Sequence, residues 1–256
     1  MKTFPTLRVM LVCALAFLTL FPLDQRTAAA DEPAVLAVDH EFEHIIVNTV
    51  DDTVDDLADD LCADQWGNCS LRAAVQCANL WPGEQTIELA EATYLLTLPG
   101  AHEDTAASGD LDVSDILIIS GAGQSLTVID GGGLDRVLEV LPAAVVQVNN
   151  LALVNGHAPA TTGFAYGRDG GGILNHAALS MENVQVSGNQ AGSQITSADA
   201  SGDGGGIYNN GGSLVLTLVE ISSNETANGV YDTYNGGDGG HGAGIFSLGG
   251  TVELTD

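Results

Sequence analysis

Hydrophobic and polar residues alternate in short runs through the second half of the chain, and the runs recur at a regular interval. Each run follows a glycine-rich segment that ends in isoleucine, at Ile173, Ile207 and Ile245. Further apolar residues recur six or seven positions downstream of these isoleucines, at Leu179, Leu214 and Val252. Alternation with a period of two predicts β-strands. The repetition predicts stacked units, because one such unit cannot bury its apolar face alone.

Breaks near Asn183 and around Gly188 divide each unit into about three short strands. Three strands and three turns make one coil of a parallel β-helix, so we expect an all-β, right-handed, single-stranded solenoid. Asparagine suits its tight corners, because it tolerates left-handed backbone angles. A leucine-rich repeat is the main alternative, but no helical segment lies between the units. The repeats are expected over residues 101–256.

One helix is predicted before the repeats, over residues 70–81. Apolar residues recur there with helical spacing, Ser70 is a suitable N-cap, and Pro82 stops the helix. An open stack of coils exposes a hydrophobic end that needs a cap. We therefore expect residues 31–100 to form an N-terminal cap region that contains this helix.

The first thirty residues have the pattern of a secretory signal peptide. Lys2 and Arg8 precede an apolar run over residues 9–20, and Ala30 ends a small-residue segment suited to cleavage. The run of 12 residues is shorter than the roughly 20 that a spanning helix needs. We expect cleavage after Ala30, no transmembrane segment thereafter, and a location outside the cell or in the envelope of a bacterium or archaeon.

The chain is strongly acidic, with a formal net charge of −28. Residues 1–30 hold three basic residues and one acidic residue, so their removal changes the charge to −30. The remaining cations are Arg72, Arg136 and Arg168. This balance argues against nucleic acid as a partner and favours solubility, calcium uptake or a saline habitat.

Three cysteines remain after signal cleavage, at positions 62, 69 and 77. In an exported protein, Cys62 and Cys69 are expected to form a disulfide that closes a small loop. Cys77 is then left over, since Cys69 and Cys77 are too far apart to bond if both lie on one helix. Zinc binding is the alternative, but no histidine lies nearby at ligand spacing.

A known domain is suggested by an ordered series of short segments. Cys69 to Asn79 reads CSLRAAVQCAN, and it is accompanied by VNTVDD before it and by GDLD, ISGAG, IDGG and RVLEV after it. This series resembles the CSLREA domain, which is found at the N-terminus of secreted bacterial and archaeal β-helix proteins. The later repeats are similar to those of chlamydial polymorphic outer-membrane proteins. The resemblance implies a pectin-lyase-like fold at the cell surface and supplies no catalytic residues. Ala73 departs from it, standing where the family has glutamate.

Candidate binding residues lie mainly in the loops. Four loop aspartates are candidates for a calcium site, at Asp199, Asp203, Asp232 and Asp238. Neither loop contains a known calcium motif, so solvated loops are the simpler interpretation. No other cofactor is expected.

We expect an exported, non-catalytic β-helix that is structural or adhesive, with surface glycans or other cell-surface proteins as partners. A polysaccharide lyase or glycoside hydrolase is one alternative, for which His241 and Arg168 are the candidate residues. A carbohydrate-binding module is another, and its candidate stacking aromatics near loops are Phe164, Tyr208, Tyr231 and Tyr234. The sequence stops inside a strand of its last unit, so we expect the protein to continue beyond Asp256.

Overall fold

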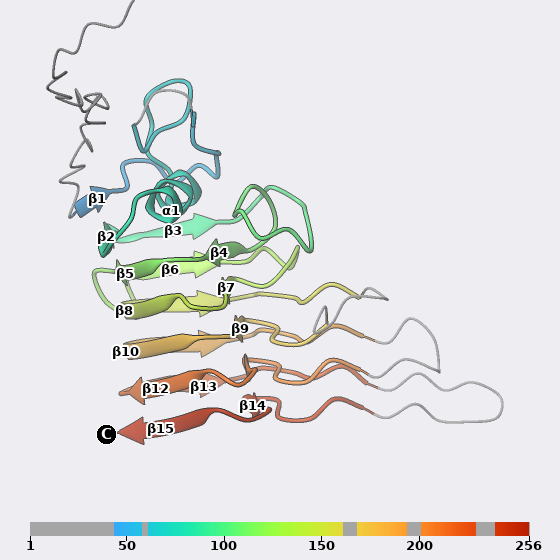
Figure 1. The fold of residues 1–256 in the computed structure, drawn as a ribbon. Helices are drawn as coiled ribbons and strands as arrows, with labels where there is room; N and C mark the ends of the chain where they lie inside the picture. The colour runs from blue at the N-terminus through green and yellow to red at the C-terminus, as the bar shows by residue number, and fades with distance from the viewer. Residues whose placement is uncertain (1–43, 58–60, 161–167, 194–200, 229–238, 256) are drawn as a thin grey trace, which may run out of the picture. The chain divides into compact units, whose positions relative to one another are not determined.

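Parallel strands stack one coil above another to form a β-solenoid (Figure 1). The computed structural model describes residues 44–57, 61–160, 168–193, 201–228 and 239–255. Every strand pairing within the described residues is parallel and joins segments from successive coils. The predicted parallel β-helix is therefore confirmed.

Two sheets line the solenoid. The first contains, in spatial order, β1 (His44–Ile46), β2 (Gln85–Glu88), β5 (Ile116–Ser120), β8 (Val145–Val154), β10 (Ala178–Ser187), β12 (Ser213–Thr217) and β15 (Thr251–Thr255). Three shorter strands pair along its second part, β3 (Ala92–Leu95), β6 (Thr127–Asp130) and β13 (Glu220–Ser222). The second sheet contains β4 (Leu111–Val113), β7 (Leu138–Val140), β9 (Ile173–Asn175), β11 (Ile207–Asn209) and β14 (Ile245–Ser247).

The strand registers place the repeated apolar residues in columns. Ile207 pairs with Ile173 on one side and with Ile245 on the other. Leu214 pairs in the same way with Leu179 and with Val252. Ile173, Ile207, Leu179 and Leu214 are buried, so the columns form the inside of the solenoid.

Asparagines occupy the corners between strands. Asn150 and Asn183 adopt positive φ angles of 55° and 53°, which this residue tolerates better than most. The Asn183 side chain donates a 2.8 Å hydrogen bond to Asn150 Oδ1 in the preceding coil. At another corner, the buried Asn175 donates to Asn209 Oδ1 over 2.7 Å. The asparagine side chains thus supply hydrogen bonds at the corners, which the apolar side chains of the columns cannot do.

Helix α1 (Leu71–Leu80) lies against β2 and β4 at the N-terminal end of the stack. Ser70 caps it, because its hydroxyl oxygen accepts a 3.0 Å hydrogen bond from the N–H of Ala73. Position 73 is alanine rather than glutamate, so no side chain there can accept a hydrogen bond from the N–H of Ser70. The reciprocal half of a capping box is therefore absent. Within the described residues, no helix has the length and apolar character required to span a bilayer.

The predicted disulfide between Cys62 and Cys69 is wrong, since the structure joins Cys62 to Cys77 with 5.3 Å between their Cα atoms. The loop between Cys62 and Cys69 winds around Asp64, which accepts backbone hydrogen bonds from Trp66 and Asn68. Cys69 then pairs with Asn48 and is buried, away from Cys62. Burial raises the pKa of the Cys69 thiol to about 11, with the nearby charge of Asp55 as a second cause.

Candidate functional site

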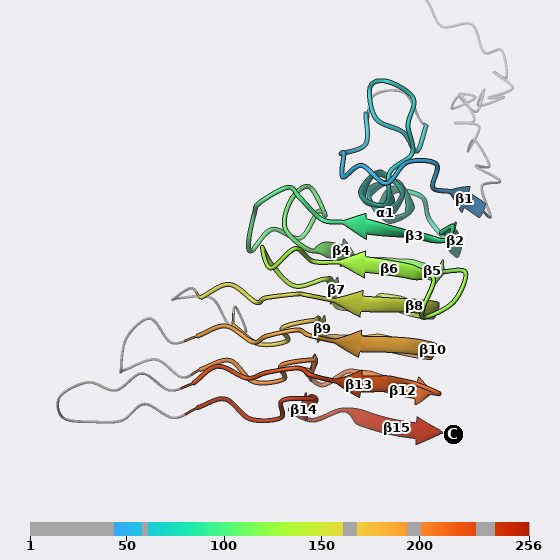
Figure 2. The same ribbon diagram turned by 180° about the vertical axis from the view of Figure 1, so that it is seen from behind.

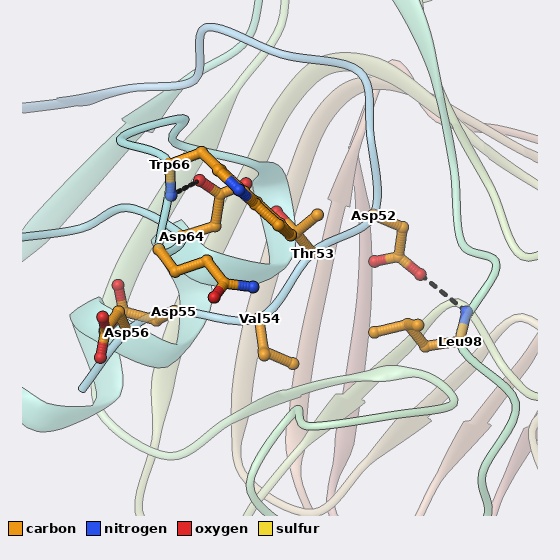
Figure 3. A pocket seen from close by; sticks show the side chains of 9 residues that line it. Asp52, Thr53, Val54, Asp55, Asp56, Asp64, Trp66 and Leu98 are labelled. Carbon is orange, nitrogen blue, oxygen red and sulfur yellow. Dashed lines mark hydrogen bonds between the residues drawn. The ribbon is translucent and has the colours of Figure 1, made fainter. Parts of the chain in front are cut away.

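A pocket of about 430 Å³ lies in the cap region, beside the loop that precedes α1 (Figure 3). Its lining combines a large aromatic ring, Trp66, with the carboxylates of Asp55, Asp56 and Asp64. Leu98 and Asp52 lie on the opposite side of the pocket from Trp66. Apolar walls with a few convergent polar groups are typical of small-molecule sites.

Asp64 holds Trp66 in its exposed position. One carboxylate oxygen, Oδ1, accepts 2.9 Å hydrogen bonds from the backbone N–H groups of Trp66 and Asn68. The N–H of Asn68 is the largest cause that lowers the pKa of Asp64, so this carboxyl remains ionised. The turn leaves Trp66 72% exposed. The repeat pattern contains no signal for Trp66, because this residue lies in the non-repeating segment before α1.

The long insertions of the repeats begin and end at one edge of the solenoid, which we call the loop edge (Figure 2). The residues that precede them, His157, Gln190 and Glu225, form parallel bridges from coil to coil. Where the chain returns, the N–H of Gly170 donates to the carbonyl of Asp203 over 2.9 Å. Gly204 donates to His241 in the same way over 2.9 Å. The flanks of successive insertions are therefore stacked in register.

Polar side chains join the return points of these insertions. Asp169 Oδ1 accepts a 2.8 Å hydrogen bond from the N–H of Asp203, and Asp203 Oδ1 accepts one of 2.6 Å from the N–H of His241. The His241 ring nitrogen Nδ1 lies 3.0 Å from the same Asp203 oxygen. Burial raises the pKa of Asp169. The side chains act here as links between neighbouring coils.

The calcium candidates fall mainly outside the described residues, which applies to Asp199, Asp232 and Asp238. Asp203 is described and is engaged with His241. Of the enzyme candidates, His241 is exposed, and the carbonyl of Arg168 accepts a 2.7 Å hydrogen bond from Gly192. Among the aromatic candidates, Tyr208 is buried and therefore unsuited to stack on a sugar, and the other three lie outside the described residues.

A cluster of buried acidic side chains lies on the outer face of the second sheet. Asp112 of β4 and Glu139 of β7 are direct neighbours across the parallel pairing, and Asp110 precedes β4. Burial is the main cause that raises the pKa of Asp110 to about 8 and of Asp112 to about 9. Repulsion from neighbouring acids adds to both shifts.

The sequence contains a signal for this cluster that periodicity alone does not reveal. Asp112 and Glu139 occupy the middle positions of Leu-Asp-Val and Leu-Glu-Val, in which the flanking apolar residues face the core. Aligning Leu111 with Leu138 places the two acids side by side. The alignment depends on the number of residues in the coil that separates the two segments, and only the structure shows that this coil brings them into register.

Comparisons of the chain with protein-family models, with curated proteins and with solved structures found no match.

Proposed function

We propose that this chain is an exported, non-catalytic scaffold whose loop edge binds molecules at the cell surface. The observation that carries the proposal is the register of the loop edge, where bridges join His157 to Gln190 and Gln190 to Glu225. A rigid stack that carries its insertions on one side is a common arrangement for binding surfaces. Export is supported by the signal-like pattern of residues 1–30 and by the Cys62–Cys77 disulfide, which suits an oxidising compartment.

Replacement of the insertions tests the role of the loop edge. Residues 194–200 and 229–238 are exchanged for short Gly-Ser linkers, and binding to intact cells and to a glycan array is measured. We expect binding to fall at least tenfold while the melting temperature stays close to that of the parent. Glu182→Gln serves as the control, because it removes an exposed charge from β10, away from the insertions. Unchanged binding by the linker variant would contradict the proposal.

Export and the lack of catalysis need separate measurements. Full-length protein expressed in a bacterial host should appear outside the cytoplasm with Asp31 as its first residue, as N-terminal sequencing would show. A glycan-cleavage screen with added calcium should give no turnover. Turnover that disappears in His241→Ala or Arg168→Ala would instead establish the enzyme alternative.

Carbohydrate binding at the cap pocket is a second candidate function, favoured by the exposure of Trp66 beside Asp64. An aromatic ring offers an apolar face for a sugar ring, and the carboxylates can accept hydrogen bonds from its hydroxyls. A glycan array with Trp66→Ala tests this function independently of the loop edge. If Trp66→Ala loses a glycan signal that the loop-edge linker variant keeps, the binding belongs to the pocket. If Trp66→Ala keeps the signal, the pocket is excluded.

A further inference from the structure

The buried acidic cluster has a geometry that the fold alone does not explain. Asp112 and Glu139 are paired directly between β4 and β7, and one carboxylate oxygen from each lies within 4.8 Å of a carboxylate oxygen of Asp110. Like charges directly opposite one another destabilise a pair of strands. When both carboxyls are ionised, water does not screen their repulsion, because Asp112 is 0% exposed.

Several oxygens of the cluster lack hydrogen-bond partners. Within the part of the chain that the structure describes, the buried atoms Asp110 Oδ2, Asp112 Oδ1 and Asp135 Oδ2 have no hydrogen-bond partner. The second oxygen of Asp112 accepts a 2.9 Å hydrogen bond from the N–H of Ala106, which fixes the carboxylate in place. A buried carboxylate oxygen without a hydrogen-bond partner is costly, and the two such oxygens of Asp110 and Asp112, which belong to one cluster, indicate that another group completes the site.

Arg136 balances only part of this charge. Its Nη1 lies 3.7 Å from Asp135 Oδ1, 3.8 Å from Glu139 Oε2 and 4.0 Å from Asp110 Oδ2. The four carboxylates of Asp110, Asp112, Asp135 and Glu139 therefore meet one guanidinium charge, and the ring nitrogen Nε2 of His176 lies 3.4 Å from Glu139 Oε1. Even when Arg136 is counted in full, a dipositive ion would leave the ionised cluster with one negative charge.

We propose that Asp110, Asp112 and Glu139 bind a calcium ion. Three points that are mutually within 4.8 Å have a common centre no more than about 2.8 Å from each, close to the 2.3–2.6 Å of calcium–oxygen bonds. Small side-chain movements would close the difference. The calcium site is independent of the proposed binding at the loop edge.

The donor set favours calcium over other metals. All three candidate ligands are carboxylates, which suit hard cations, whereas zinc sites usually include sulfur or nitrogen ligands. Calcium tolerates irregular coordination and accepts additional backbone carbonyls and waters, while magnesium requires a nearly regular octahedron. The Glu139 side chain is 15% exposed and so provides a route from solvent to the site.

A bound ion would connect the cap to the solenoid. The segment that carries Ala106 and Asp110 is held on one side by Arg72 of α1, whose guanidinium donates to the carbonyls of Ala106, Gly109 and Asp110. On the other side, Asp112 and Glu139 belong to strands of the second sheet. Calcium would thus fix this segment against the sheet and stabilise the N-terminal end of the stack.

Calorimetric titration of the chelator-treated protein with calcium chloride and, separately, magnesium chloride tests the site. About 0.15 M sodium chloride is included to screen weak binding by the acidic surface. We expect one saturable calcium ion per chain at this cluster, a higher melting temperature in calcium, and weaker binding of magnesium. Asp112→Asn keeps the side-chain shape and should lower calcium affinity at least tenfold, and Glu139→Gln should weaken it in the same direction. The control Glu182→Gln should bind as the parent does.

Two results would overturn the proposal. The first is the absence of saturable calcium binding and of a calcium-dependent melting shift in the parent, which would mean that protons rather than a metal neutralise the buried acids. The second is calcium binding that Asp112→Asn and Glu139→Gln both retain, which would place the ion elsewhere. If Asp112→Asn fails to fold, Glu139→Gln decides between the outcomes, because its side chain lies at the partly exposed margin.

Discussion

Arg72 and Asp52 form an ion pair inside the cap, with 2.6 Å between Nε and Oδ1 and with side chains 0% and 2% exposed. The remaining Arg72 donors bind backbone carbonyls of the segment before β4. The second oxygen of Asp52 accepts hydrogen bonds from the N–H groups of Thr97 and Leu98. One pair of residues thus joins the segment before α1, the helix itself, the segment with Thr97 and Leu98, and the segment before β4.

Arg72→Met should lower the free energy of unfolding by about 3–5 kcal/mol, because it leaves Asp52 buried and unpaired. Denaturant unfolding followed by circular dichroism measures the change. The double variant Asp52→Asn/Arg72→Met should cost less than the sum of its single variants, since the two residues interact. A loss below about 1 kcal/mol for Arg72→Met would show that the pair is not needed to order the cap.

Removal of the Cys62–Cys77 disulfide should also destabilise the cap. The bond closes a loop of 15 residues, for which chain entropy suggests about 3 kcal/mol. Cys62→Ser/Cys77→Ser is compared with Cys69→Ala, and peptide mapping of the oxidised parent identifies the bonded pair. We expect the mapping to recover peptides that join positions 62 and 77 and the double variant to be the less stable. Recovery of a bond to Cys69 would contradict the structure.

Leu218→Asn should stabilise the solenoid. Leu218 occupies the corner that Asn150 and Asn183 occupy in earlier coils, and its φ of 51° is unfavourable for leucine. Its side chain is 60% exposed, so little packing is lost. Asparagine at this position can continue the hydrogen-bonded column, and we expect a gain of about 1 kcal/mol. Leu218→Ala is the matched control, since it shortens the side chain but keeps the backbone strain. Equal stability of the two variants would argue against the role of the corner.

The metal-free protein should lose stability as the pH rises. Burial raises the pKa values of Asp110 and Asp112 to about 8 and 9, far above the value near 3.9 expected for an unfolded chain. Between about pH 4 and pH 8–9 the folded state binds more protons than the unfolded state. The stabilisation that these bound protons provide is therefore complete below about pH 4 and declines as the pH rises, until it is lost at pH 8–9. Glu103, Asp135 and Glu139 add repulsion around the pair, and Arg136 opposes it.

Melting temperatures recorded in chelator from pH 5 to pH 9 test this expectation. The decline should be steeper for the parent than for Asp112→Asn, which cannot ionise at that position. Added calcium should flatten the decline of the parent. Parallel profiles for the parent and for Asp112→Asn in chelator would show that the buried acids do not govern the pH dependence.

The solenoid was predictable because its determinants repeat. Ile173, Ile207 and Ile245 recur with a similar downstream apolar pattern, and a slip of the register by one residue would turn those residues to the outer face. The helix was predictable from local spacing and from the Ser70 cap. These features need only short-range or periodic information.

The disulfide and the acidic cluster depend on how non-repeating segments pack against one another. The partner of Cys62 is decided by the turn around Asp64 and by the pairing of Cys69 with Asn48. The cluster requires β4 and β7 to be adjacent and the segment with Asp110 to fold over them. Neither relationship follows from residue spacing, so the sequence supplied the residue types without their partners.

Coil length in this protein varies without disturbing the ladder. Val146 to Leu179, Leu179 to Leu214 and Leu214 to Val252 span 33, 35 and 38 residues, yet each pair lies in register. Most of the additional residues enter at the loop edge, where loop-closure entropy grows only slowly with length. Foreign peptides grafted there should consequently be presented at fixed spacing along one side, which makes the solenoid a natural framework for multivalent display.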